Sequence, residues 1–227
     1  MMVLLSLLLS GCAADRAQLS VPIVMTGSNE TVTPTPQVSV RLTAAELVIG
    51  DLRFESPPEV ARRWRPSLLS IGHAHPGHDF SGDVDGELLG EWSIDLLALS
   101  EPMRLGEASF YEGDYESARL ELPDGGAVLL EGYATVEGLD TTRSFRFALL
   151  PEQSITGIPF ITTVDADTPP QQVSLSIDLG HALSFIDWAA PDDGDGLLTE
   201  ADDDGVVGNA ALFGAVSTPT YSFIMEP

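Results

Sequence analysis

The chain has 227 residues, 35 of them acidic and 10 basic, which gives a formal net charge of −25. Nucleic acids and anionic lipids are polyanions that such a surface repels, so we expect neither as a partner. The length suits one well-packed domain, and a single cysteine, Cys12, rules out an intramolecular disulfide.

The first eleven residues form an apolar run that is too short to cross a bilayer as a helix, which is typical of an export signal. The run ends in Leu9-Ser10-Gly11-Cys12, which resembles the lipobox of bacterial lipoproteins. The resemblance implies cleavage of residues 1–11, a diacylglyceryl group on the sulfur of Cys12 and an acyl group on its amino terminus. Two or three acyl chains hold a protein stably on a membrane. We therefore expect a lipid-anchored, extracytoplasmic protein of the cell envelope.

Residues 12–36 contain Ser, Thr, Pro, Asn and Gly without sustained periodicity, and we interpret them as a flexible tether. Apolar residues then alternate at Val38, Val40 and Leu42, and the alternation resumes over 47–54. This spacing predicts a strand with a bulge. It also marks the beginning of a single domain over residues 37–227.

Short alternating runs separated by turn residues continue along the chain. We expect strands near residues 92–96, 105–111, 118–122, 127–136, 145–149, 155–164, 173–179 and 221–224, and a short helix over 206–216. Pro159 would place its strand at a sheet edge, because proline cannot donate to a neighbouring strand. Pro123-Asp124-Gly125-Gly126 is typical of a hairpin turn. Together these runs predict an all-β fold: an antiparallel β-sandwich or partly open barrel with at most one or two short helices.

Three of the four histidines lie within the six residues His73-Ala74-His75-Pro76-Gly77-His78. In an extended segment His73 and His75 point to the same side. Pro76-Gly77 suits a type II turn that brings the Cα atoms of His75 and His78 within roughly 7 Å. Converging neutral imidazoles suit a divalent transition metal such as Cu(II) or Zn(II). We therefore predict His73, His75 and His78 as metal ligands.

Further residues complete this hypothetical site. Asp79, Asp83 and Asp85 follow the third histidine closely and would donate an oxygen or orient an imidazole. His181 follows the run of cleanest alternation and would be a fourth ligand brought by a neighbouring strand. The His-x-His opening resembles that of metallo-β-lactamases, but Pro76 and Gly77 interrupt their His-x-His-x-Asp-His pattern, so nothing is carried over. With no base beyond Asp79 to activate a metal-bound water, we expect binding without turnover.

A second cluster holds seven acidic residues between positions 192 and 204. Asp alternating with Gly is typical of loops that surround Ca²⁺ with oxygen ligands. The stretch resembles an EF-hand loop with Asp193 and Asp195 in ligand positions, but Pro191 stands at the first ligand position and Asp202 where a bidentate Glu belongs. We keep two interpretations: an irregular calcium loop using Asp192, Asp193, Asp195 and Asp202, or a hydrated acidic loop.

The sequence thus predicts a lipid-anchored metal-binding protein for metal capture, delivery or sensing at the envelope. The alternative is a surface interaction or structural β-sandwich, stiffened by calcium, in which the histidines are incidental. A metallohydrolase ranks third, since it needs an open coordination position beside a cleft.

Overall fold

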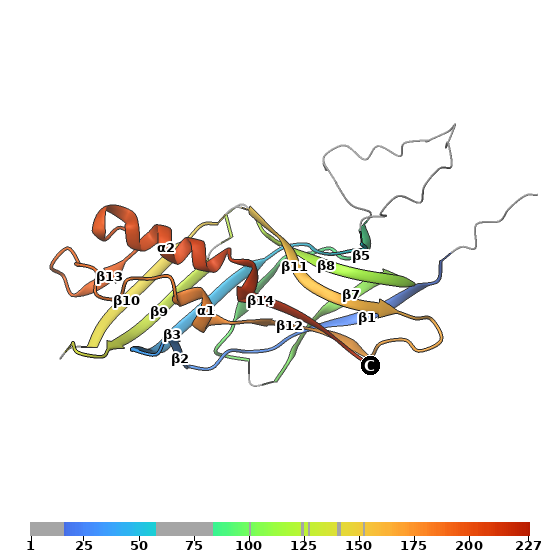
Figure 1. Ribbon diagram of the computed structural model, residues 1–227, viewed down its shortest axis with the longest axis horizontal. Helices are drawn as coiled ribbons and strands as arrows, with labels where there is room; N and C mark the ends of the chain where they lie inside the picture. Colours follow the sequence, from blue (N-terminus) through green and yellow to red (C-terminus); the bar gives the residue numbers. More distant parts are fainter. Residues whose placement is uncertain are drawn as a thin grey trace, which may run out of the picture.

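The computed structural model describes residues 16–57, 84–99, 101–123, 125–126, 128–139, 142–151 and 153–227. Among the described residues, strands account for 56% and helices for 12%, so the fold is all-β, as predicted. The strands form two sheets in an elongated molecule, and one of the sheets nearly closes into a barrel (Figure 1). Only one helix among the described residues, over 206–215, has seven or more residues.

The elements follow one another in chain order. They are β1 (Gln18–Met25), β2 (Thr31–Thr35), β3 (Val38–Ile49), β4 (Leu52–Glu55), β5 (Val84–Leu88), β6 (Trp92–Asp95), β7 (Met103–Tyr111), β8 (Gly113–Leu122), β9 (Val128–Val136), β10 (Thr142–Leu149), β11 (Gln153–Val164), β12 (Gln172–Ile177), α1 (Leu179–Leu183), β13 (Leu197–Thr199), the 3-10 helix η1 (Asp203–Gly205), α2 (Val206–Ala215), the 3-10 helix η2 (Thr218–Thr220) and β14 (Tyr221–Glu226).

The larger sheet has eight strands in the order β11-β8-β4-β5-β7-β1-β12-β14. All neighbours are antiparallel except β1 and β12. The two end strands approach each other, and the hydroxyl of Thr162 on β11 lies 3.5 Å from the sulfur of Met225 on β14. Pro159 lies on β11, so its predicted place on an edge strand is confirmed.

Aromatic side chains fill the interior of this nearly closed barrel. The ring centroids of Phe54 and Phe110 are 4.7 Å apart, and those of Phe54 and Phe160 are 4.9 Å apart. Tyr115 and Phe223 pack around them, and all five rings are buried. An eight-stranded barrel has room for side chains and little else, so the barrel is a packed core.

The smaller sheet has the order β13-β10-β9-β3-β2, with β6 beside β2 on the same edge of β3. β3 covers the predicted strand as far as Ile49, and its pairing with β9 shifts between Leu42 and Ala44, which confirms the expected bulge. The rest of the prediction, to Phe54, is wrong as one strand, because β4 belongs to the larger sheet. Phe145 and Phe147 on the inner face of β10 pack against Trp188. α1 and α2 lie over this sheet (Figure 1), and α2 contacts β10.

The chain passes between the two sheets at several places. In two of them, β3 leads into β4 through residues 50–51, and β8 leads into β9. Where they cross, Gly50 donates its N–H to the carbonyl of Glu121 at 2.8 Å, and Glu121 donates to that of Asp51 at 3.0 Å. The turn after Pro123 forms, since the N–H of Gly126 lies 2.9 Å from its carbonyl. The predicted hairpin is nevertheless wrong, because β8 pairs with β4 and β11 whereas β9 pairs with β3 and β10.

The predicted tether over residues 12–36 is also wrong for its described part. β1 lies between β7 and β12 and buries Val21, Ile23 and Met25, and β2 pairs with β3. The polar composition of the segment conceals an alternation that begins at Leu19. Pro22 is tolerated because β12 pairs with β1 only from Ile23 onward.

Candidate functional site

The histidine-bearing connection is inserted between two paired strands. β4 and β5 are antiparallel neighbours, and Glu55 at the end of β4 lies opposite Val84 at the start of β5. The predicted metal ligands His73, His75, His78 and Asp79 lie outside the described residues, as does Cys12. The structure therefore shows where the predicted metal-binding segment leaves and re-enters the barrel, at adjacent positions of one sheet.

An ion pair between Arg16 and Asp85 lies where the insertion joins the barrel. Asp85 comes directly after Val84, and its Oδ1 lies 2.8 Å from Nη1 of Arg16. Its other carboxylate oxygen accepts a hydrogen bond from the hydroxyl of Ser56, which follows β4. Arg16 also donates from Nε to the carbonyl of Glu112 at 2.7 Å. Asp85 thus links the two ends of the insertion to each other through Ser56. Arg16 links them to the chain just before β1 and to the β7–β8 turn.

Tyr115 supports the same region from inside the barrel. Its hydroxyl donates to the carbonyl of Asp85 at 2.6 Å and accepts the N–H of Tyr111 at 3.1 Å. Burial raises the pKa of Tyr115 above its ordinary value of 10.0, so the phenol stays protonated and keeps donating across the physiological range. The backbone at Asp85 is therefore held from both sides.

His181 lies on α1, not on a strand. The Asp178 carboxylate caps this helix by accepting the N–H of His181 at 2.9 Å. The imidazole Nε2 lies 3.4 Å from the hydroxyl of Ser217, and the ring meets Phe185 edge to face. α1 contacts β2, α2 and η2, whereas β5, which follows the other histidines, contacts β4 and β7. In Figure 1 these two groups of elements lie in different halves of the molecule.

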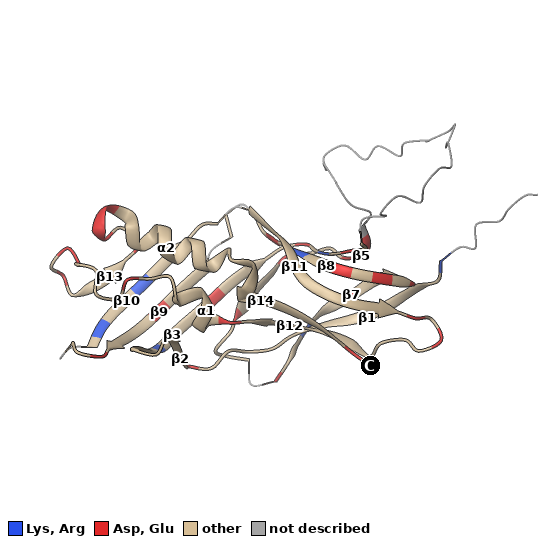
Figure 2. Cartoon of the chain, viewed as in Figure 1, with Lys and Arg blue, Asp and Glu red and all other residues tan. Residues whose placement is uncertain are grey.

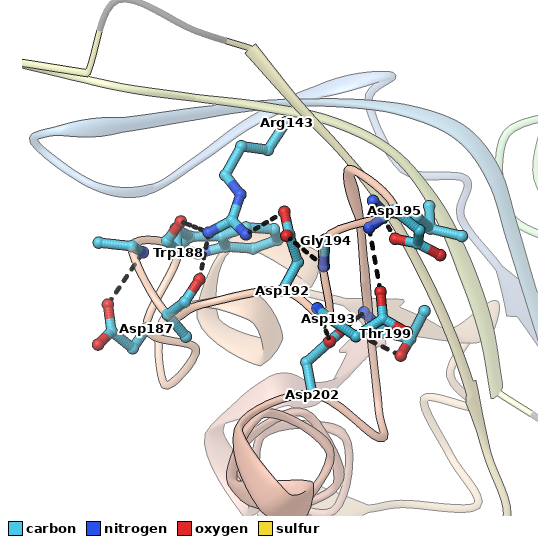
Figure 3. Close-up of polar contacts among 12 residues, drawn as sticks. Arg143, Asp187, Trp188, Asp192, Asp193, Gly194, Asp195, Thr199 and Asp202 are labelled. Carbon is cyan, nitrogen blue, oxygen red and sulfur yellow. Dashed lines mark hydrogen bonds and ion pairs between the residues drawn. The ribbon is translucent and has the colours of Figure 1, made fainter.

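Arg143 holds the loop before the acidic cluster. It occupies a core-facing position on β10 with Phe145 and Phe147, and it reaches out over the sheet edge (Figure 3). Its guanidinium donates to the carbonyls of Trp188 and Ala190 and lies 2.9 Å from Oδ2 of Asp192. Asp192 is thus committed to an ion pair with Arg143.

The other carboxylates of the acidic loop bond mainly to the loop's own backbone. Asp193 accepts the N–H of Asp195 at 3.1 Å, and Asp195 accepts that of Leu197 at 2.7 Å. Glycines at positions 194, 196 and 205 have positive φ and let the chain turn between them. This local bonding is typical of Asx turns.

Asp202 closes the loop from the other side (Figure 3). Its Oδ2 accepts the N–H of Thr199 at 2.6 Å and the Thr199 hydroxyl at 3.0 Å, and its Oδ1 accepts the N–H of Asp193 at 3.0 Å. These bonds, the Thr199 N–H first, lower the pKa of Asp202 below its ordinary value of 3.8 although the residue is buried. Asp202 is therefore ionised at neutral pH and serves as an internal acceptor.

The four residues expected to bind calcium do not converge. Asp192 faces Arg143, Asp193 and Asp195 face successive backbone amides, and Asp202 faces Thr199. No group of three His, Cys, Asp or Glu side chains within the described ranges is arranged to hold a metal ion. The described loop is organised by hydrogen bonds and one ion pair.

A shallow hollow of about 370 Å³ lies beside this loop, between the end of β10 and the start of α2. Leu150 and Leu212 are among its lining residues, and Glu200 is its one charged member. The Glu200 carboxylate lies 3.4 Å from the N–H of Ala148. The hollow has no convergent set of polar groups and contains none of the predicted metal ligands.

Comparison of the chain with protein-family models, with curated proteins and with solved structures found no match. None of the helices in the described ranges has the length and apolar character needed to span a bilayer. The functional conclusions below therefore depend on this chain's own residues.

Sequence reasoning missed Arg143 and the contacts of Arg16. Arg143 could have been noticed in the sequence, because the alternation along the strand places this arginine on the same face as the inward-facing Phe145 and Phe147. Arg16 carries none, since its partners Asp85 and Glu112 lie 69 and 96 residues away along the chain.

Proposed function

We propose that this protein is a lipid-anchored, extracytoplasmic metal-binding protein that takes up Cu(II) or Zn(II) through His73, His75 and His78. The observation that carries the proposal is the clustering of three of the chain's four histidines in six residues. Imidazole is a good ligand for both ions, and the chain's only thiol is the expected site of lipidation. Metal capture, delivery or sensing at the envelope follows from this combination.

The strand pairing around the insertion supports this proposal. Glu55 and Val84 face each other in the sheet, so the histidine-bearing connection begins and ends at one place on a rigid barrel. Asp79 follows the third histidine directly in the sequence and is our choice for a fourth ligand.

We leave His181 out of the ligand set, because its ring contacts Phe185, just after α1, and Ser217, just before η2, and α1 does not lie beside β4 or β5. We also leave out a calcium role for the acidic loop, because its carboxylates already accept bonds from Arg143, Thr199 and backbone amides. The ion-binding function is thus assigned to residues 73–79 alone.

Calorimetric titration of the protein lacking residues 1–11 with Cu(II) and with Zn(II) tests the proposal. We expect one equivalent to bind, and the His73→Ala, His75→Ala, His78→Ala triple variant to lose at least tenfold in affinity, which corresponds to about 1.4 kcal/mol. The matched control is His181→Ala, which should bind as the parent does. Indistinguishable curves for the parent and the triple variant would refute the proposal.

A second variant separates binding from folding. Replacing residues 58–83 with a short turn should leave the circular dichroism spectrum of the β-sheets unchanged, because Ser56, Asp85 and Arg16 remain to close the barrel end. This variant should bind no metal. If it retains the parent's affinity, the site lies elsewhere in the chain.

A further inference from the structure

We infer that the barrel end formed by the start of β1 and the β7–β8 turn faces the lipid bilayer at close range. We call this surface the basal end; it comprises Arg16, Asp85, Tyr111, Glu112 and Asp114. The inference rests on the lipid anchor of the proposed function and adds the orientation of the domain on its membrane. The chain between Cys12 and the first residue bound to the barrel is too short to let the domain turn away from the membrane.

Arg16 is fixed to the barrel. Its guanidinium donates to Asp85 at 2.8 Å and to the carbonyl of Glu112 at 2.7 Å. The guanidinium carbon Cζ lies 6.0 Å from the centre of the Tyr111 ring. Glu112 also donates its N–H to the carbonyl of Ala17 at 2.8 Å, and β1 pairs with β7 from Gln18 onward. The chain is therefore part of the folded domain from Arg16 onward.

Only residues 13–15 separate Cys12 from Arg16. Fully extended chain covers at most about 3.6 Å per residue, so the Cα atoms of Cys12 and Arg16 can be no more than about 14 Å apart. A tether over residues 12–36 would have allowed several times this distance. With acyl chains on Cys12, the basal end must stay next to the headgroups.

The negative charge of the basal end determines which lipid headgroups it can approach. Asp85, Glu112 and Asp114 lie there with Arg16, and the adjacent β11–β12 loop adds Asp165 and Asp167 (Figure 2). An acidic surface within about one Debye length of the bilayer, about 8 Å at physiological ionic strength, is repelled by anionic lipid. The surface is therefore suited to zwitterionic headgroups.

The two ends of the molecule then have different surroundings. The insertion carrying His73, His75 and His78 leaves the barrel beside Asp85, at the basal end. The acidic loop and the start of α2 lie at the opposite end of the long axis (Figure 1) and face away from the membrane.

The single cysteine provides a test that does not depend on cellular lipidation. The protein lacking residues 1–11 is coupled through Cys12 to maleimide-bearing lipid in a supported phosphatidylcholine bilayer, and neutron reflectometry measures the position and thickness of the protein layer. We expect the layer to begin within about 14 Å of the headgroups, with the long axis directed away from the bilayer.

Two variants provide the comparison. Twelve Gly and Ser residues inserted between Asp15 and Arg16 should move the layer outward and broaden it, because a flexible chain of that length spans about 20 Å on average. Replacing a fraction of the phosphatidylcholine with phosphatidylglycerol at low salt should widen the gap of the parent protein to the limit of its chain. The inference would be overturned if the parent layer were as distant or as broad as that of the insertion variant. It would also be overturned if the molecule lay flat on the bilayer or adsorbed onto phosphatidylglycerol.

Mass spectrometry of Cys12 in protein extracted from membranes reports separately on the anchor itself. An unmodified Cys12 would remove the anchor from the proposed function, whatever the reflectometry shows. Acylated Cys12 together with a distant layer would refute the orientation and leave the anchor in place.

Discussion

Asp202 shows how one carboxylate can order a loop that consists mostly of acidic residues. It is buried, and its two oxygens accept bonds from the backbone of Asp193 and from the backbone and hydroxyl of Thr199. Buried polar groups are costly unless they are bonded in this way. The same bonds that stabilise its charge also leave less of the carboxylate for an external ion.

We predict that Asp202→Asn lowers the free energy of unfolding by about 1 to 2 kcal/mol at pH 7, because the amide is a weaker acceptor and brings an unneeded donor. The pKa of Asp202 is lower in the folded than in the unfolded chain, so its stabilisation is present above its ordinary value of 3.8 and disappears as the pH falls through the folded value. Urea unfolding of both proteins from pH 7 to pH 3 measures this difference.

The control for this prediction is Asp167→Asn. Asp167 is exposed on the β11–β12 loop, and the contacts of the described residues include none to its carboxylate. Its replacement should change the free energy of unfolding by less than about 0.5 kcal/mol at every pH. A pH-independent difference between the parent and Asp202→Asn would contradict the assigned role of the charge.

Among the elements, β3 shows how a local irregularity depends on a neighbouring strand. Leu42 pairs with Gly132 and Ala44 pairs with Glu131, so Thr43 is the extra residue of the bulge. A Cβ atom on Gly132 would lie 2.2 Å from the carbonyl oxygen of Arg41. The close approach of β9 to the bulged part of β3 therefore requires glycine at position 132.

Gly132→Ala should lower the free energy of unfolding by about 2 kcal/mol, because the backbone of β3 or β9 must shift to admit the methyl group. Chemical denaturation measures the effect. Thr135→Ser, an exposed position on the same strand, is the matched control and should stay within about 0.5 kcal/mol of the parent. Equal stability of Gly132→Ala and the control would show that the bulge does not need this glycine.

At the scale of the whole molecule, the two sheets share one core. β3–β4 and β8–β9 run from one sheet into the other, and the buried apolar residues, including Phe160 in the barrel and Phe147 under α2, form one connected cluster. Loss of either half would expose apolar surface of the other. We therefore expect both sheets to unfold together.

Phe160→Leu and Phe147→Leu test this coupling. Each should lower the free energy of unfolding by about 1 to 3 kcal/mol, since each leaves a cavity in the shared core. Each variant should still unfold in one transition, with the same midpoint by far-ultraviolet circular dichroism and by tryptophan fluorescence, to which Trp188 contributes. Two separate midpoints in either variant would show that the sheets are independent units.

Parts of the candidate sites could be recognised from the sequence, and other parts became visible only in the structure. The histidine cluster and the lipobox can be recognised from sequence because their residues are neighbours in the chain. Arg143 and Arg16 act on carbonyls and carboxylates that are remote in sequence, so their roles became visible only in the folded chain. The acidic loop was recognised as a cluster, but the direction of each carboxylate depends on turn geometry that composition does not express.

For this protein, the sequence by itself determined the all-β class, the bulged strand at Val38, the edge position of Pro159 and the short helix after residue 205. These features follow from side-chain alternation, proline's missing donor and helical spacing, all of which act over a few residues. Only the tertiary structure decided that β1 and β2 belong to the sheets and that β8 and β9 do not pair with each other. Strand partners are chosen by the burial of apolar faces over the whole molecule, so a local pattern indicates a strand without indicating its neighbour.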